Sequence, residues 1–304
     1  MRNTRTADIL LSQSFCGGKN VCNSDYCDLH IHTTASDGEC TPHQVVSQAR
    51  EIGLKAISLC DHDTISGFQE LSRLYFCCND GTLAASGVEV IPGIEINSEW
   101  RGRELHILGY FINPDDEGFS RILETLRDSR IQRLYLILQK LRKLDVFIDI
   151  SRVLEMAQGE SVGRPHVAKA MVEKGYVGDI KEAFQRYLGI GKPGYAERFH
   201  LSPIESIRAI RRAKGVAIWA HPGTAKADDL LGELIQNGLQ GLEVYHPEHD
   251  RELQQQYKRI AVENRLLITG GSDFHSFSDP VGAQIGSHWI SYDSVLHMKQ
   301  LAKA

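Results

Sequence analysis

The sequence predicts an α/β barrel that is interrupted by a helical insert, and two observations lead to this expectation. Short apolar segments of strand length alternate with helical patterns in the first and last parts of the chain, and this alternation stops between residues 114 and 199. A chain of 304 residues, 42% of them hydrophobic, is long enough to bury the core of one large domain with an insert. We therefore expect an N-terminal extension at 1–27, a discontinuous barrel at 28–113 and 200–304, and an insert at 114–199.

The first part of the barrel is predicted from local start and stop signals. Thr41 and Pro42 are suited to the start of a helix and Gly53 to its end, with Val45 and Ala49 on one face between them. Apolar runs bounded by polar residues predict the strands. We expect strands at 28–33, 56–60, 89–95 and 104–111, and helices at 42–53 and 65–75.

Helical patterns without a convincing strand fill the insert, and strand–helix alternation then resumes. In the insert we expect helices at 119–144, 151–156, 165–174 and 180–188. After it we expect helices at 203–213, 228–237 and 248–263, and strands at 215–220, 241–245 and 267–270. Because helices connect successive strands, the pattern indicates a parallel sheet, and about six or seven such units suggest closure into a barrel.

Charge and composition argue against several classes of function. The formal net charge of −5 does not suit a protein that binds long nucleic acid without sequence preference, because such binding needs a basic surface. We expect no signal peptide and no membrane span, because no apolar run approaches the roughly 18 residues that a span requires. The seven cysteines include no CxxC pair, so we expect free thiols in a cytoplasmic protein. Nothing in the pattern points to an obligate protein partner.

Side chains that can bind metals recur where the predicted strands end, which in a βα barrel is the rim that carries active sites. His30 and His32 are two residues apart in a strand, so they lie on one face and can bind one ion. The other such side chains are Asp37, Asp61, His62, Asp63, Glu95, His106, His221, Asp273 and His275. A single histidine in an apolar strand is usually a core residue. Burying so many titratable groups is costly unless they are paired or metal-bound, so we predict a metal centre.

The order of these motifs, HxH, DHD, a strand-end Glu, a His, HP and DxH, resembles the polymerase-and-histidinol-phosphatase (PHP) superfamily over roughly residues 26–112 and 200–285. The segments PGIE, ELHILGY, GRPHVA, YLGIGKPGY, AHPG and GSDFH resemble a narrower group within it. That group contains nucleoside 3′,5′-bisphosphate phosphatases, AMP-type phosphatases and 5′-to-3′ exoribonucleases that act on short RNA. The resemblance implies a distorted (β/α)7 barrel with two or three divalent metal ions.

The same resemblance implies which side chains hold each ion. The three expected groups are His30, His32, Glu95 and Asp273 for the first ion, Glu95, His106 and His221 for the second, and Asp37, His62 and His275 for the third. Many superfamily members have a histidine where this chain has Asp37, and a carboxylate there favours Mn²⁺, Mg²⁺ or Fe²⁺ over an all-zinc site. We expect Mn²⁺ first, with Zn²⁺ also accepted, and the third position to be the weakest.

For catalysis we hypothesise that a metal-bound hydroxide attacks phosphorus in line, with no covalent enzyme intermediate. The catalytic candidates are the three residues of the DHD motif. His62 is expected to bind an ion, whereas Asp61 and Asp63 are expected to orient metal-bound histidines or to accept a proton.

Substrate specificity is expected to lie in the insert. Arg164 and His166 come just before or at the start of a predicted helix, where a phosphate group is readily bound. The alternative for Arg164 is a solvated loop charge. Arg198 and His200, where the insert returns to the barrel, are further candidates. The arginines spaced along the first insert helix, Arg127, Arg130 and Arg133, are expected to form a solvated face.

The function predicted from these residues is hydrolysis of a phosphate ester of a small nucleotide: a nucleoside 3′,5′-bisphosphate, a nucleoside monophosphate or a short 5′-phosphorylated RNA. A histidinol-phosphate phosphatase is the main alternative, since it uses the same metal framework, but its resemblance to the insert is poorer. A non-catalytic metal-binding module would lack some ligands, and every expected position is filled here. An amidohydrolase usually needs a bridging lysine at a strand end, and the DHD and SDFH motifs fit it less well.

Overall fold

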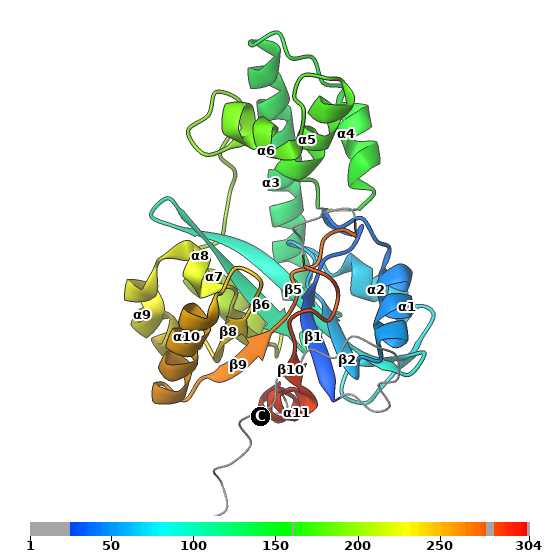
Figure 1. Cartoon of the computed structure of the whole chain (residues 1–304), viewed down its shortest axis with the longest axis vertical. Helices are drawn as coiled ribbons and strands as arrows, with labels where there is room; N and C mark the ends of the chain where they lie inside the picture. The colour runs from blue at the N-terminus through cyan, green and yellow to red at the C-terminus, as the bar shows by residue number, and fades with distance from the viewer. Residues whose placement is uncertain (1–24, 160, 278–282, 303–304) are drawn as a thin grey trace, which may run out of the picture.

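The computed structural model describes residues 25–159, 161–277 and 283–302. Its main sheet has the spatial order β10–β1–β2–β5–β6–β7–β8–β9. The strands are β1 (Tyr26–Ile31), β2 (Ala56–Leu59), β5 (Val88–Trp100), β6 (Arg103–Tyr110), β7 (Val216–Trp219), β8 (Gly241–Tyr245), β9 (Leu267–Gly270) and β10 (Ile290–Ser291), with a small pair, β3 (Phe76–Cys77) and β4 (Leu83–Ala85), beside β5. Ile31 bridges Phe274 just after β9, so the sheet is a nearly closed barrel, and the predicted fold class is confirmed (Figure 1).

The direction of β6 differs from the expected parallel sheet. β1, β2 and β5 run parallel to one another, as do β7, β8 and β9, but β6 is antiparallel to both β5 and β7. The reason is that β5 and β6 are joined by a tight turn at Arg101 and Gly102, both with positive φ, and not by a helix. As a consequence, His106 lies within a strand, opposite Asn97 of β5.

Helices cover the outside of the barrel. They are α1 (Pro42–Ile52), α2 (Ser66–Ser72), α7 (Pro203–Arg212), α8 (Pro222–Ala225), η2 (Asp228–Leu230), α9 (Leu231–Gln236), α10 (Arg251–Glu263) and α11 (Tyr292–Ala302). α1 begins and ends where expected: Thr41 and Gln44 form a capping box, and Gly53 ends the helix with a φ of 84°. β10 and α11 were not expected, and α11 closes one end of the barrel, where Val295 and Met298 are buried (Figure 1).

The insert forms a layer of helices beyond the opposite end of the barrel (Figure 1). It contains α3 (Glu117–Arg142), α4 (Ile150–Ala157), α5 (Arg164–Glu173), α6 (Ile180–Ala183) and the π-helix η1 (Phe184–Leu188). α3 belongs to two cores: Phe119 and Leu126 pack in a barrel core, whereas Leu134 and Leu141 pack in a core made by the insert helices. This long helix therefore sets where the insert sits above the barrel rim.

Other sequence-based expectations concern the chain ends and the cysteines. β1 begins at Tyr26, two residues before the expected start of the barrel, and residues 1–24 lie outside the described ranges. The described cysteines, Cys27, Cys40, Cys60, Cys77 and Cys78, are free thiols. Among the helices that the structure describes, none is long and apolar enough to cross a membrane.

Candidate metal centre

The end of β1 and the loop after β9 come together at the barrel rim. His30 and His32 lie on the same side of the chain at the end of β1, and both are fully buried. At Gly271 a Cβ atom would lie 2.3 Å from the backbone nitrogen of His30, so only glycine allows this close approach. Asp273 is thereby brought to both histidines: its Oδ1 lies 3.3 Å from His30 Nε2 and 3.0 Å from His32 Nε2.

Glu95 of β5 lies at the middle of the centre, and its side chain is almost completely buried. Histidine nitrogens surround both of its oxygens. Around Oε1 are His106 Nδ1 at 2.7 Å and His221 Nε2 at 3.1 Å, and around Oε2 are His62 Nδ1 at 2.9 Å, His32 Nε2 at 3.3 Å and His30 Nε2 at 3.4 Å. One carboxylate therefore faces the histidines expected at two different ion positions, which is the geometry of a bridging ligand.

Asp37 lies in the loop after β1 and gathers a third set of rings. Its Oδ2 is 3.8 Å from His62 Nε2, and its Oδ1 is 3.5 Å from His275 Nε2 and 3.9 Å from His32 Nδ1. These separations are too long for hydrogen bonds, yet the side chain of Asp37 is only 12% exposed. The spacing leaves room for an ion among these atoms.

The residues present fit divalent metal ions. The ligand atoms of the first expected group, and those of the third group together with His32, lie within 4.8 Å of one another. The expected second group is divided between two clusters. Glu95 and His106 cluster with His62, and His221 clusters with His246 and Asp273. Among the described residues, His32 Nδ1, Asp37 Oδ1, His62 Nδ1 and Glu95 Oε2 are buried and lack an aligned hydrogen-bond partner. Buried imidazole and carboxylate atoms of this kind are suitable ligands for a divalent cation.

The electrostatics of the centre favour cations. Burial alone raises the pKa of a carboxyl group, but the surrounding histidines hold the pKa values of Asp37, Glu95 and Asp273 well below their usual range. Burial alone lowers the pKa of an imidazole, but the carboxylates of Asp273 and Glu95 raise the pKa of His32 to about 10. At His62 the effect of burial prevails, and its pKa is lowered. The centre therefore contains ionised carboxylates at neutral pH, and their field attracts divalent cations.

Asp61 and Asp63 have partners other than the expected metal-binding histidines. Asp61 accepts hydrogen bonds from the backbone and hydroxyl of Thr33, both at 2.8 Å, and from the hydroxyl of Ser36 at 2.7 Å. Asp63 accepts from the backbone of Asn97 at 3.0 Å and also from two arginines of the insert. Both carboxylates thus bond to the loops around His62 and not to its ring, and their expected roles of orienting metal-bound histidines or accepting a proton stay a prediction.

Arg164 and His166 begin helix α5. Arg164 is largely buried, with 15% of its side chain exposed, and its Nη2 lies 3.0 Å from Glu104 Oε1, which does not fit the alternative of a solvated loop charge. His166 is buried, and its Nδ1 accepts the backbone N–H of Gly163 at 3.0 Å. His166 therefore caps the helix through Nδ1, which leaves only its Nε2 free to meet a substrate.

Arg198 and His200 lie on the return from the insert. Arg198 Nη2 donates to Asp63 Oδ2 at 2.9 Å, whereas its Nε and Nη1 are buried without a hydrogen-bond partner in the described part of the chain. Burial, with Arg130 nearby, lowers the pKa of Arg198 to about 10, so it remains charged at neutral pH. Burial and the charge of Arg198 lower the pKa of His200 to about 4, so its ring is neutral.

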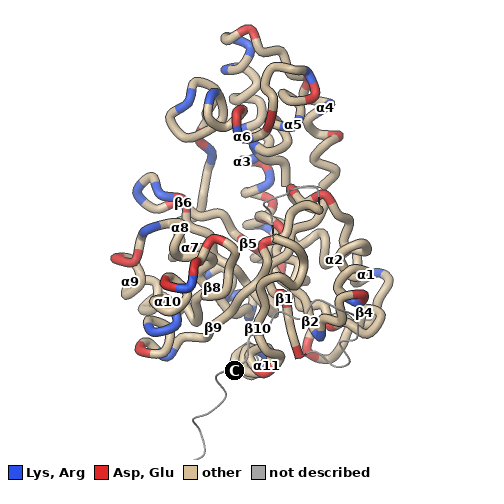
Figure 2. Tube along the Cα trace, in the orientation of Figure 1, with Lys and Arg blue, Asp and Glu red and all other residues tan. Residues whose placement is uncertain are grey.

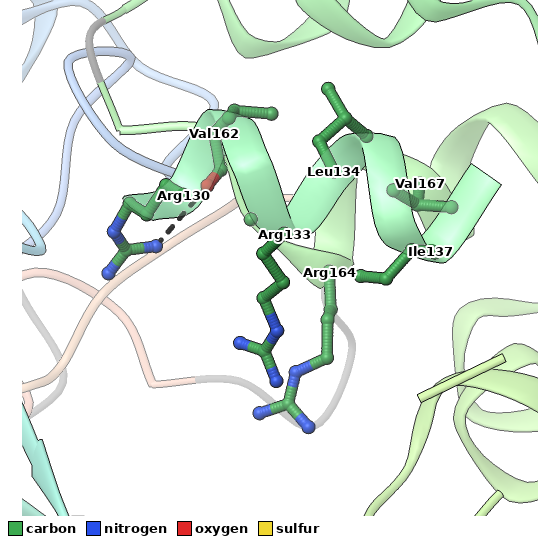
Figure 3. A pocket seen from close by; sticks show the side chains of 8 residues that line it. Arg130, Arg133, Leu134, Ile137, Val162, Arg164 and Val167 are labelled. Atoms are coloured by element: carbon green, nitrogen blue, oxygen red, sulfur yellow. Dashed lines mark hydrogen bonds between the residues drawn. The ribbon is translucent and has the colours of Figure 1, made fainter. Parts of the chain in front are cut away.

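The prediction that the arginines of α3 form a solvated face is wrong for Arg130 and Arg133, which are only 7% and 8% exposed. Arg130 bonds to Asp63 through Nε at 2.8 Å and Nη2 at 2.5 Å, and its Nη1 donates to the carbonyl of Val162 (Figure 3). Arg133 donates to the carbonyl of Ala196 at 2.7 Å, and its side chain points the same way as that of Arg164 (Figure 3). The insert therefore presents a cluster of four arginines next to the metal centre: Arg130, Arg133, Arg164 and Arg198.

Two residues of the centre were missed in the sequence, and both belong to β8 or follow it. The side chain of Glu243 is fully buried and accepts from His30 Nδ1 at 2.9 Å. His246 Nε2 lies 3.3 Å from Asp273 Oδ2. Their position in the barrel could have indicated them. The other predicted parallel strands carry site residues at their carboxyl ends, whereas the strand at 241–245 was assigned none.

Comparisons with known proteins agree with this geometry. Residues 28–200 match the family model for the PHP domain. The chain is 33% identical over 277 residues to a 5′-3′ exoribonuclease of Haemophilus influenzae, covering 88% of this chain and 96% of that protein. It is 28% identical over 262 residues to a 3′,5′-nucleoside bisphosphate phosphatase of Chromobacterium violaceum, covering 82% of this chain and 87% of that protein. A crystal structure from Bifidobacterium adolescentis, assigned as a metal-dependent phosphoesterase, superposes with a TM-score of 0.80 at 30% identity, covering 90% of this chain and 96% of that one.

The family match covers more than half of the chain, and the exoribonuclease relative aligns over nearly its whole length. The chain therefore belongs to the PHP family. It is a metal-dependent hydrolase of phosphate ester bonds, in agreement with the names of its relatives and with the clusters of possible metal ligands.

Proposed function

We propose that this enzyme hydrolyses a terminal phosphate ester of a small nucleotide or a short 5′-phosphorylated RNA, and that the arginine cluster binds a second phosphate group of the same substrate. Water replaces the ester oxygen on phosphorus with no covalent phosphoenzyme: a monoester gives an alcohol and inorganic phosphate, and a diester at the end of an RNA gives an alcohol and a phosphate monoester. The observation that carries the proposal is the position of four mostly buried arginines beside a centre of imidazole and carboxylate ligands.

The metal ions are assigned to the groups around Glu95 and Asp37. We propose that His30, His32, Glu95 and Asp273 hold one ion and that Asp37, His62 and His275 hold another. We assign a further ion to Glu95, His106 and His221, because both histidines lie against Glu95 Oε1, at 2.7 and 3.1 Å. Bound divalent cations would supply a water molecule of lowered pKa and positive charge against the phosphate oxygens. Manganese is our first choice, because the set mixes hard carboxylate oxygens with imidazole nitrogens.

The arginine cluster carries more positive charge than its carboxylate partners neutralise. Among the described residues, three of its four guanidinium groups pair with two carboxylates, those of Asp63 and Glu104, and Arg133 donates to the carbonyl of Ala196. The buried Nε and Nη1 of Arg198 and the buried Nη2 of Arg133 have no hydrogen-bond partner within the same ranges. A dianionic phosphate group would accept from these donors and balance the charge.

The cluster is next to the metal centre and not on a separate surface. Asn97 links the two, because it lies 3.2 Å from His106 Nε2 and its Oδ1 accepts from Arg130 at 3.3 Å. Elsewhere Lys and Arg positions are interspersed with Asp and Glu positions over the described elements (Figure 2). Positive charge concentrated in the arginine cluster favours a small substrate with two phosphate groups, or the 5′ end of a short RNA, over long nucleic acid.

The test is product formation by the full chain loaded with Mn²⁺, measured as inorganic phosphate from the monoester substrates and as nucleoside monophosphate or inorganic phosphate from the RNA. Four substrates are compared at equal concentration: adenosine 3′,5′-bisphosphate, AMP, a short 5′-phosphorylated RNA and histidinol phosphate. We expect the bisphosphate or the RNA to be hydrolysed fastest, and His30→Ala to abolish hydrolysis. A preference for histidinol phosphate would replace the proposed substrate class. No hydrolysis product from any of the four substrates with Mn²⁺-bound protein would reject the proposed function.

A further inference from the structure

Glu243 of β8 contacts both sides of the metal centre although it is absent from the ligand groups proposed above. Its side chain has no exposed surface. Its Oε1 accepts from His30 Nδ1 at 2.9 Å, and its Oε2 accepts from the backbone N–H of His221 at 2.9 Å. One rigid carboxylate is therefore bonded to a histidine of the first ion group and to a histidine of the second.

The bond to His30 determines which ring nitrogen is available to an ion. Because Nδ1 carries the hydrogen that is donated to Glu243, the lone pair that an ion can use is on Nε2. That nitrogen lies 3.4 Å from Glu95 Oε2 and 3.3 Å from Asp273 Oδ1, among the other ligands of the first group. Carboxylates commonly orient metal-binding histidines in this manner.

The bond to His221 acts on the backbone. His221 has a φ of 27° and a ψ of 58°, a conformation that residues other than glycine rarely adopt. In this conformation its Nε2 lies 3.1 Å from Glu95 Oε1, and its Nδ1 lies 3.0 Å from the hydroxyl of Thr224. That hydroxyl donates to the carbonyl of His221, so Nδ1 is the donor and Nε2 again faces the centre with a free lone pair.

An alternative role for Glu243 is that of a direct ligand, because it clusters with His30 and His246 within 4.8 Å. The hydrogen bonds argue against a separate ion in this group. His30 already uses Nδ1 for Glu243 and directs Nε2 to Glu95 and Asp273. His246 accepts the backbone N–H of Glu248 at Nδ1, so its hydrogen is on Nε2, directed at Asp273 Oδ2 at 3.3 Å.

We propose that Glu243 is a positioning residue that holds His30 and His221 at a fixed separation on either side of Glu95 and thereby couples the two ion positions that share Glu95. This inference rests on the metal assignment made in the proposed function. It identifies a residue that acts on the ions through two other side chains and has no contact with the substrate.

The test is Glu243→Gln, which keeps the shape of the side chain. An amide has one acceptor oxygen for the two N–H donors, so one of the two histidines must lose its bond. We expect the dissociation constants of the two tightest Mn²⁺ ions to rise by about 10- to 100-fold, with the weakest position unchanged. Binding is measured by Mn²⁺ titration of the metal-free full chain, with free Mn²⁺ followed by electron paramagnetic resonance.

Glu89→Gln is the matched control. Glu89 belongs to β5 at the other end of the same barrel, where it pairs with Lys299 and accepts from the hydroxyl of Tyr292. The substitution removes the same charge without touching a histidine, so it should leave all Mn²⁺ affinities within about twofold of the wild type. Equal losses in both variants would overturn the inference, because the effect would then be one of net charge.

A second measurement does not depend on activity. In the Zn²⁺-loaded chain labelled with ¹⁵N-histidine, we expect a hydrogen-bonded Nδ1–H signal that is lost in His30→Gln and is lost or strongly shifted in Glu243→Gln. The inference would be refuted if this signal and the Mn²⁺ affinities were both unchanged in Glu243→Gln. If Glu243→Gln does not fold, Glu243→Asp is used, which retains both acceptor oxygens on a shorter side chain and should weaken Mn²⁺ binding less. Hydrolysis of the four substrates is scored separately, so failure of the proposed function leaves this result interpretable.

Discussion

The two arginines on Asp63 lead to a prediction about stability: Asp63→Asn should lower the free energy of unfolding by about 3–5 kcal/mol at pH 7. The side chain of Asp63 has no exposed surface and accepts from Arg130 Nε at 2.8 Å and from Arg198 Nη2 at 2.9 Å. Asparagine retains the shape and can still accept the backbone N–H of Asn97. The substitution leaves two buried guanidinium groups without their negative partner. The loss of this partner determines the expected decrease in the free energy of unfolding.

The pKa of Asp63 gives a second measure of the same interaction. Burial alone would raise it, but Arg130 and Arg198 lower the pKa from 3.8 to about 2. A shift of this size corresponds to roughly 2.5 kcal/mol in favour of the ionised form. Because the pKa is lower in the folded than in the unfolded chain, this stabilisation is fully present above about pH 4 and is lost as the pH falls through about 2. The difference between wild type and variant should therefore shrink over that window.

The assay is equilibrium unfolding of the full chain in urea, followed by circular dichroism at several pH values. Asp229→Asn is the matched control, because Asp229 and Arg103 form an Asp–Arg pair whose side chains are 62% and 36% exposed. That exposed pair should contribute less than about 1 kcal/mol. The reasoning would be refuted if Asp63→Asn cost no more than Asp229→Asn, or if its cost were independent of pH.

Three further predictions concern the substrate, the barrel closure and the third ion. In steady-state assays, Arg164→Ala should raise KM for adenosine 3′,5′-bisphosphate about tenfold or more and KM for AMP much less. Arg152 forms an exposed ion pair with Glu173, so the control Arg152→Ala should change neither KM. Gly271→Ala should lower the free energy of unfolding by at least about 2 kcal/mol in urea titrations, because the added Cβ would collide with the backbone of His30. Gly232→Ala is the control: its Cβ would meet no atom within 4 Å, so the substitution should be neutral or stabilising. Asp37→Asn should reduce the number of bound Mn²⁺ ions by one, measured by metal analysis after dialysis, and an unchanged number would reject Asp37 as a ligand.

Elements with local signals could be predicted from the sequence. The start and end of α1 depend on Thr41, Gln44 and Gly53, which all lie within or beside the helix itself. The direction of β6 could not be predicted in this way. An apolar run specifies a strand but not its partner, and the turn at Arg101 and Gly102 was not recognised as a hairpin.

The arginines of α3 show a second limit of local patterns. Arg130 and Arg133 are three residues apart on a helix, a spacing that is typical of a solvated charged face. Their burial depends on partners far away in the sequence: Asp63 is 67 residues from Arg130, and Ala196 is 63 residues from Arg133. A buried arginine is stable only with such partners, so its environment follows from tertiary structure and not from helical periodicity.

The proposed ligands could be located in the sequence for a physical reason that also explains why Glu243 was missed. In a βα barrel the carboxyl ends of parallel strands converge on one rim, so chemically active residues at strand ends lie close together whatever their separation in the chain. His30 and Asp273 are 243 positions apart, yet their atoms are 3.3 Å apart. Applied to every parallel strand, the same rule would have pointed to β8 and to Glu243. Because Glu243 is buried and bonded to two histidines of the centre, the rule locates the proposed positioning residue as well as the proposed ligands.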